Sequence, residues 1–387
     1  MESPLFDIDI PGMQATVNKF QPGTGLAWAA LFPLKYTRKF DLKGLEGDEG
    51  IPVAADRVAF NTKAPKKTRQ KVGTWSGKLS KYAVSRDKDE VEINEYLDAQ
   101  TLANTATENQ QEKQELVNLV YDDVTFVRKA MDYKVELDCM RIASSGVQTF
   151  PAKIEGDMAT QDTIDFNVPK ANFIGVSISN KKSKDGKPTI EAVTWDDEEN
   201  ADGLLDLANA QDMIAKQGLT KPRYAFMEKS KFNQLIAQKK TAKRLYPQVN
   251  DLSMITADMI TLEKINAYNE NPSRGYPHII ILDTYVTIEH KDASRETIKP
   301  WNVNVVTLSP TQQLGWTYYK NVPMVQNTSA LQVYGAFFKV TRYSEVNPQS
   351  ETTLAEAYVQ PALINRKSLV FLNTANKTWA DGEAATA

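Results

Sequence analysis

The clearest pattern of apolar positions lies between residues 107 and 144, a stretch without proline or glycine. Apolar residues recur there at steps of three or four, at Leu116, Val120, Val124, Val127, Met131 and Val135. This spacing predicts a long helix with one apolar stripe, ended by Gly146. Charged residues such as Arg128, Asp132 and Glu136 fill the other faces. The helix would span roughly 50 Å, and we interpret it as a strut because no partner segment for a coiled coil is visible.

After this helix, short strand patterns alternate with helical ones. The sequence predicts helices at 198–216 and 229–238, and strands at 172–179, 189–195, 223–227, 278–282, 284–290, 303–308, 315–319 and 330–343. Two further strand-like pieces lie around Pro361. The run HIIIL at 278–282 is apolar throughout, which is typical of a central strand. We therefore expect an α+β protein.

The first 50 residues follow neither periodicity. Prolines stand at positions 4, 11, 22 and 33, and aromatic residues such as Trp28 and Phe32 lie among them. Prolines at this spacing disfavour a long helix and favour extended chain. The aromatic residues need a surface to pack on, so we expect an arm that docks on its own chain or on a neighbour; a disordered tail is the alternative.

Two adjacent segments carry opposite charge. Nine basic residues and no acid lie between Arg57 and Arg86, and eight acids with one base, Lys88, follow between Asp87 and Glu112. Alternation within the basic segment predicts a long hairpin with its tip at 63–71. The segments could be solvated surface, or could neutralise each other within or between chains. The candidate contact residues are Lys63, Lys66, Lys67, Arg69 and Lys71 on the basic side, and Asp87, Asp89, Glu90, Glu92 and Glu95 on the acidic side.

Composition excludes several function classes. The chain has 387 residues, is 41% hydrophobic and 25% charged, and carries a net charge of −3, which does not suggest a basic nucleic-acid-binding protein. No apolar stretch of about 18 residues predicts a membrane span, and no secretory signal pattern is visible at the start. The single cysteine, Cys139, excludes an intramolecular disulfide framework.

Candidate chemistry is sparse. The sequence contains no GxGxxG, GxxxxGK[ST], HExxH or GxSxG motif. The run 196–199 (DDEE) could hold a hard cation, but acids more often complement a helix N-terminus. Cys139 is expected in the core, His278 at a strand edge and His290 in a turn. We therefore expect no enzymatic activity, no cofactor and no metal.

Four passages resemble a known family in their order and local pattern. They are 121–150 (YDDVTFVRKAMDYKVELDCMRIASSGVQTF), 221–238, 278–323 and 351–375, the last with a proline between two strands. Together they resemble the tailed-phage major capsid proteins of the lambda-like major capsid protein E family. No single motif is diagnostic, so the likeness rests on the order of the parts.

The resemblance implies the tailed-phage major capsid fold. Its parts would be an N-terminal arm (1–50), an extended loop (51–100), a peripheral domain (101–189) with a spine helix (107–144), an axial domain (190–324), a return to the peripheral domain (325–375) and a flexible tail (376–387).

The resemblance also implies a function. Hexamers and pentamers of the protein would form an icosahedral shell around double-stranded DNA, held by non-specific contact. Separate scaffold, portal and decoration proteins would be its partners, and it would assemble in the host cytoplasm, mature, and reside in the virion. The alternatives are an encapsulin-type nanocompartment shell protein and a non-shell phage structural or binding protein.

Overall fold

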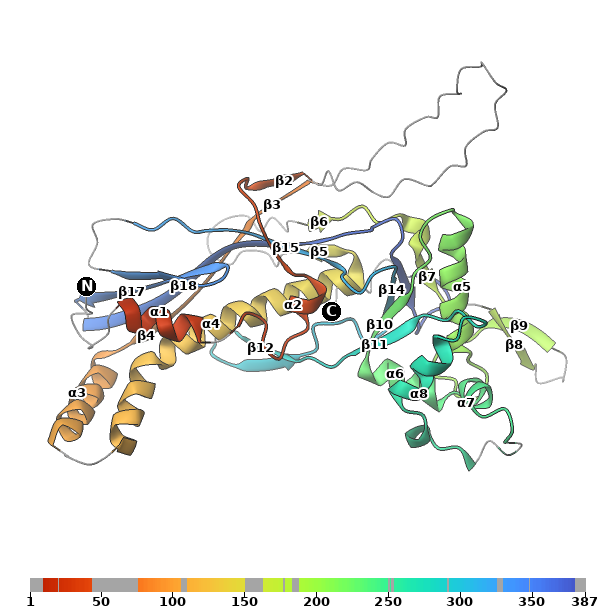
Figure 1. The fold of residues 1–387 in the computed structure, drawn as a ribbon, viewed down its shortest axis with the longest axis horizontal. Helices are drawn as coiled ribbons and strands as arrows, with labels where there is room; N and C mark the ends of the chain where they lie inside the picture. The colour runs from red at the N-terminus through yellow and green to blue at the C-terminus, as the bar shows by residue number, and fades with distance from the viewer. Residues whose placement is uncertain are drawn as a thin grey trace, which may run out of the picture. The chain divides into compact units, whose positions relative to one another are not determined.

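The computed structural model describes residues 10–19, 21–43, 76–105, 110–149, 163–176, 178–182, 188–249, 251, 254–290, 292–325, 330–347 and 349–379. The chain forms two compact units, each assembled from separate stretches of sequence (Figure 1). The first unit comprises residues 1–42, 77–137 and 316–362, and the second comprises 43–76, 138–315 and 363–387.

The first unit is built on a six-stranded sheet. Its strand order is β1 (Leu34–Tyr36), β15 (Gly315–Lys320), β18 (Gln349–Leu363), β17 (Phe338–Val346) and β16 (Leu331–Tyr334), and β4 (Ser80–Lys88) also pairs with β18. Alternate residues of β18, namely Thr353, Ala355, Ala357 and Val359, are fully buried. Since side chains alternate between the faces of a strand, these residues place one face of the sheet in the core.

Two helices follow β4: α3 (Glu90–Thr105) and α4 (Gln110–Ser145). Val124, Val127, Met131 and Val135 of α4 are buried. Leu116 and Val120 lie within α4, but their side chains are outside the described residues. The helical region is thus longer than the 107–144 helix of the sequence analysis, because α3 precedes it within the segment expected as loop.

A capping box begins α3. The carboxylate of Asp89 accepts hydrogen bonds from the N–H groups of Val91 and Glu92, both at 3.0 Å, and Glu92 Oε2 accepts from the Asp89 N–H at 3.3 Å. This reciprocal pattern satisfies amides that the first turn of a helix leaves free. The D-x-x-E signature of the capping box is present in the sequence at 89–92, so these acids have a local structural role besides their charge.

The N-terminal segment is not wholly extended, contrary to the expectation from its prolines. It contains α1 (Ile10–Asn18) and α2 (Trp28–Leu31). Pro11 stands in the first turn of α1, where the missing N–H has no helical partner to lose. Pro22 lies between the two helices and Pro33 follows the second, so their spacing permits two short helices.

The second unit holds a five-stranded sheet. Its order is β11 (His278–Leu282), β10 (Tyr224–Glu228), β14 (Val305–Ser309), β19 (Val370–Asn373) and β7 (Phe173–Gly175). Buried residues of α5 (Gly203–Lys216), α6 (Lys229–Ala237) and α8 (Leu262–Asn269) share one core with this sheet, and α7 (Lys239–Leu245) adds Ala242 to it. On the opposite face, the Thr307 hydroxyl donates to the carbonyl of Ala143 near the end of α4, at 2.7 Å.

Four two-stranded pairs complete the described strands. They are β2 (Asp41–Lys43) with β3 (Ser76–Lys78), β5 (Val147–Thr149) with β6 (Thr163–Asp165), β8 (Ile178–Lys182) with β9 (Pro188–Ala192), and β12 (Val286–Glu289) with β13 (Arg295–Ile298). Two 3₁₀ turns cover Lys170–Asn172 and Ala257–Met259.

The HIIIL run forms β11, but this strand lies at the edge of the sheet rather than at its centre. The outer edge at Ile279 is covered by a side chain from α8: Asn266 Oδ1 accepts from the Ile279 N–H at 2.8 Å, and Asn266 Nδ2 donates to the Ile279 carbonyl at 2.9 Å. The amide thus takes the place of a neighbouring strand, and an apolar run becomes acceptable at an edge.

Pro361 also differs from expectation, since it lies inside β18 and not between two strands. The residues of β18 that pair with β17 end at Ala357, and those that pair with β4 end at Val359. Pro361 follows both ladders, so neither of them loses a hydrogen bond to its missing N–H.

We expect Val127→Asp to unfold the subunit or make it insoluble. Val127 has no exposed surface, and an unpaired carboxylate there would cost several kcal/mol. Thermal melting of the soluble fraction checks this. Lys129→Asp, on the exposed face of the same helix, is the matched control and should melt near the wild type. An unchanged melting temperature for Val127→Asp would show that the stripe does not stabilise the fold.

Candidate functional site

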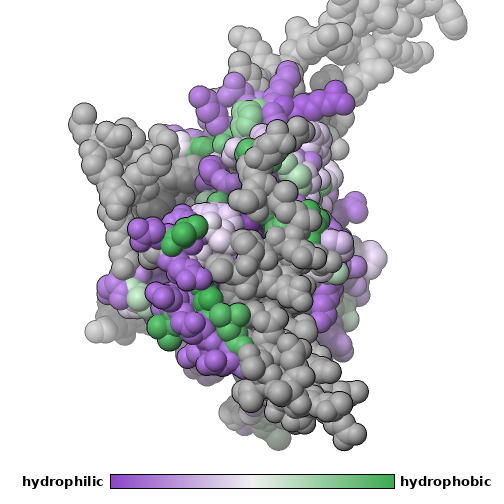
Figure 2. Space-filling view, turned by 90° about the vertical axis from the view of Figure 1, so that its left-hand side faces the viewer, coloured by the Kyte–Doolittle hydropathy of each residue, from purple (hydrophilic) through white to green (hydrophobic). Residues whose placement is uncertain are grey.

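The basic half of the expected contact, Lys63, Lys66, Lys67, Arg69 and Lys71, lies outside the described residues. The acidic half is described. Asp87 lies in β4, Asp89 precedes α3, and Glu90, Glu92 and Glu95 lie in α3; all five are exposed. Asp89 and Glu92 also cap α3, so Asp87, Glu90 and Glu95 are the members without a role in that capping box. Figure 2, which views the molecule from the left of Figure 1, shows hydrophilic and hydrophobic residues interspersed over the coloured part of this face.

Next to this acidic segment, an ion-pair cluster ties the end of β4 to α4. Arg86 contacts Asp122 at 2.9 Å and Asp123 at 3.3 Å, and Lys88 Nζ lies 3.2 Å from Asp123 Oδ2. The side chains of Lys88 and Asp123 are almost fully buried. Removing one partner of a buried pair costs about 3–5 kcal/mol, because the other charge is left uncompensated. Part of the charge in these segments is therefore neutralised within the chain.

A second set of charged side chains on α4 holds the N-terminal arm. Glu136, fully buried, accepts hydrogen bonds from the N–H groups of Trp28 at 2.7 Å and Ala27 at 3.4 Å, at the start of α2. Arg128 Nη2 donates to the carbonyl of Gln21 at 3.1 Å. The indole of Trp28 packs edge-on against Phe337, with 5.7 Å between ring centroids. The arm thus docks on α4 of its own chain.

Asp132 lies between these two contacts on the same helix. Its carboxylate is 3.5 Å from Arg128, and it is buried. Burial raises the pKa of Asp132 from 3.8 to about 6, against the opposing effects of Arg128 and of a hydrogen bond from the backbone of Gly23. The same burial lowers the pKa of Arg128. Arg128, Asp132 and Glu136 lie on a face of α4 away from the apolar stripe and are nevertheless buried. Their shared spacing of four residues is the sequence signal that they form one face.

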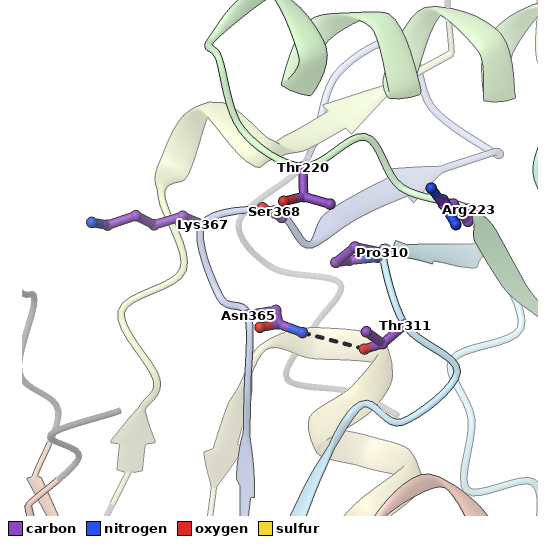
Figure 3. A pocket seen from close by; sticks show the side chains of 7 residues that line it. All are labelled: Thr220, Arg223, Pro310, Thr311, Asn365, Lys367 and Ser368. Atoms are coloured by element: carbon purple, nitrogen blue, oxygen red, sulfur yellow. Dashed lines mark hydrogen bonds between the residues drawn. The ribbon is translucent and has the colours of Figure 1, made fainter. Parts of the chain in front are cut away.

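The second unit contains a small polar cavity of about 220 Å³ (Figure 3). Its lining residues are Thr220, Arg223, Pro310, Thr311, Asn365, Lys367 and Ser368. Asn365 donates to the hydroxyl of Thr311 at 3.2 Å, and Figure 3 shows Lys367 pointing away from the cavity. The lining holds neither a histidine nor a carboxylate to act as a general base, so this cavity does not suggest catalysis.

The remaining residues considered for chemistry make contacts that stabilise local structure. The carboxylate of Asp197 accepts from the N–H groups of Glu199 at 3.2 Å and Asn200 at 3.1 Å, in a turn before α5, and Asp202 is the N-cap of that helix. Cys139 is buried and not in a disulfide. His278 Nδ1 lies 2.6 Å from Glu270, and His290 Nε2 lies 3.1 Å from Glu296.

Over the described ranges, no three His, Cys, Asp or Glu side chains gather as a metal site would require. Among those same residues, no helix combines the length and the apolar character needed to cross a membrane.

We expect Asp132→Asn to remove a pH dependence of the free energy of unfolding that the wild type shows between about pH 6 and 4. Because its pKa in the fold lies above its ordinary value, ionised Asp132 destabilises the native state above pH 6, and this penalty disappears as the pH falls from about 6 to 4. A shift of this size corresponds to at most about 3 kcal/mol. Melting curves of the variant should lack the gain in stability that the wild type shows on acidification through this range.

The exposed substitution Asp87→Asn is the matched control and should keep the pH dependence of the wild type. An identical pH profile for Asp132→Asn and the wild type would contradict the assignment.

No protein-family model matches the sequence, and a comparison with curated proteins also finds no match. Solved structures do match. A prophage protein of Escherichia coli CFT073, assigned as a capsid protein, aligns over 95% of this chain and 99% of its own, with 14% identity and a TM-score of 0.52. A phage-related protein from Bordetella bronchiseptica RB50 aligns over 94% and 96%, with 14% identity and a TM-score of 0.47. A chain of the satellite phage P4 procapsid aligns over 96% and 93%, with 8% identity and a TM-score of 0.43.

At these identities a likeness shows the fold alone. The mixed helix and sheet architecture, matched over nearly the full length of the prophage protein, confirms the expected fold class. The chain has the capsid fold of tailed phages.

Proposed function

We propose that the protein is the major capsid protein of a tailed double-stranded DNA phage or prophage. The observation that carries the proposal is the alignment of 95% of the chain with the prophage protein of E. coli CFT073. The resemblance of four sequence passages to the lambda-like E family supports the same assignment. Hexamers and pentamers of the subunit would tile an icosahedral shell.

The family's parts are proposed on this chain with the bounds given by the sequence: arm 1–50, extended loop 51–100, peripheral domain 101–189 and 325–375, axial domain 190–324 and tail 376–387. Within this scheme the described residues 80–88 of the loop form β4, and α3 begins at Glu90. The docking of the arm on α4 gives the subunit a fixed starting conformation for assembly.

The proposal includes partners and location. The protein would act with separate scaffold, portal and decoration proteins, and would touch packaged DNA without sequence preference. A net charge of −3 limits repulsion between many packed copies. Assembly would take place in the host cytoplasm, and the product would be the virion head.

Electron microscopy of the expressed protein tests the proposal. We expect closed shells, tubes or sheets of regular hexamers. Monomers that stay monomeric at high concentration would overturn it. Shells that enclose a protein cargo would favour an encapsulin-type nanocompartment instead.

We expect the triple reversal Lys66→Glu, Lys67→Glu, Arg69→Glu to block assembly without unfolding the subunit. Exposed ion pairs are worth only about 0–1 kcal/mol each, so a single reversal should have little effect. Sedimentation and melting measure the two properties. The reversal of exposed Lys170, Lys216 and Lys243 to Glu changes the net charge equally and should assemble. Normal shell yield from the loop variant would argue against this contact.

A further inference from the structure

A basic and aromatic surface lies on the first unit around β1. We call it the β1 patch; it consists of Lys35, Arg38, Lys39, Phe40, Trp316 and Lys320. Lys35 Nζ lies 4.8 Å from the ring centroid of Trp316, and Lys320 Nζ lies 4.2 Å from that of Phe40. Lys35, Arg38 and Lys39 are exposed, and 45% of Phe40 is accessible. The chain from Phe32 to Phe40 contains no acid and is followed by exposed Asp41, so the four cations of the patch outnumber the adjacent acid and the patch is positive.

The patch is held firmly by backbone contacts. Lys35 is opposite Tyr318 in the parallel pairing of β1 with β15. The Leu79 N–H donates to the carbonyl of Phe40 at 2.9 Å, and the ring of Phe40 lies 5.3 Å from that of Tyr358 in β18. Lys320 Nζ donates to the carbonyl of Arg38 at 3.0 Å. A rigid surface that combines aromatic rings with cations has the composition of an interface centre.

A group of exposed acids of the same unit lies elsewhere along β18, while exposed Asp41 directly follows Phe40. We call Asp87, Glu90 and Glu95 the α3 patch. Asp87 is opposite Thr352, whereas Phe40 of the β1 patch contacts Tyr358. Six residues of strand separate these two positions, which is roughly 20 Å. That separation exceeds both the reach of a side chain and the Debye length of about 8 Å, so the two patches do not neutralise each other within one copy.

We propose that the β1 patch of one copy receives the α3 patch of a second copy. The occupant is another copy of this chain because both complementary surfaces are present on every chain, at separate places on one sheet. A contact between two different surfaces of identical subunits is heterologous, and its repetition closes rings or extends lattices. The inference rests on the proposed capsid function and adds a second contact to it.

Three full-length variants test the contact. The basic-side variant carries Lys35→Glu, Arg38→Glu and Lys39→Glu, and the acidic-side variant carries Asp87→Lys, Glu90→Lys and Glu95→Lys. The third variant combines all six. The acidic-side set omits Asp89 and Glu92, since these residues cap α3. Three lost ion pairs at about 0.5 kcal/mol each correspond to a roughly tenfold weaker contact. Repulsion between the like charges that then face each other weakens the contact further.

We expect each single-side variant to reduce the assembled fraction at least about tenfold, and the combined variant to return to within about twofold of the wild type. The Lys170, Lys216 and Lys243 reversal changes the net charge as the basic-side variant does, serves as its control and should assemble normally. Melting of the unassembled protein verifies that each variant is folded. If a Glu variant melts early, the corresponding Gln variant replaces it and should show a smaller loss of assembly.

The outcomes separate the two proposals. Normal assembly of both single-side variants, or no rescue in the combined variant, overturns this contact, while shells of the wild type leave the capsid function standing. A wild type that forms no assembly overturns both.

Discussion

Buried charge on α4 is the constraint on which the first unit depends. A helix with a purely apolar buried stripe could pack against a sheet in several registers. Here Glu136, Asp132 and Arg128 are also buried, and each buried charge requires a partner at a defined position. Glu136 finds two amides at the start of α2, and Arg128 finds the carbonyl of Gln21. The apolar stripe provides most of the burial, and these polar contacts determine where the arm must lie.

The same principle applies farther toward the N-terminus of α4, at Asp122 and Asp123. Asp123 is buried beside Lys88, and Arg86 bridges Asp122 and Asp123. These pairs hold the end of β4, and hence the start of α3, against α4. A rigid acidic segment results, because Asp89 and Glu92 lock the first turn of α3 while Asp87, Glu90 and Glu95 remain exposed. Charges that are fixed in direction lose less entropy on binding than charges on a mobile chain.

In the contact between copies that we propose, charge separation along β18 is the feature that makes a neighbour necessary. A subunit whose opposite charges were all paired within the chain would have no charged surface left to select a neighbouring copy. In this protein some of the opposite charges meet within the chain, as at Arg86 and Asp122, and others are kept apart by the length of one strand. The separation leaves complementary surfaces on each copy, which is the arrangement that repeated contacts between identical subunits need.

Several features followed from the sequence alone because local periodicity encodes them. The spacing of Val124, Val127, Met131 and Val135 predicted the helix and its buried side, and the run 278–282 predicted a strand. The order of four passages predicted the capsid fold, although no single motif identified it.

Only the tertiary structure decided which polar residues are buried: Arg128 and Glu136 look like solvent-facing positions until the arm covers them. It also placed β11 at an edge of its sheet. There the side chain of Asn266, in α8, supplies the hydrogen bonds that a neighbouring strand would otherwise make. Periodicity indicates which side of a helix or strand is apolar. The burial of Arg128 and Glu136 and the edge position of β11 depend instead on contacts between different elements.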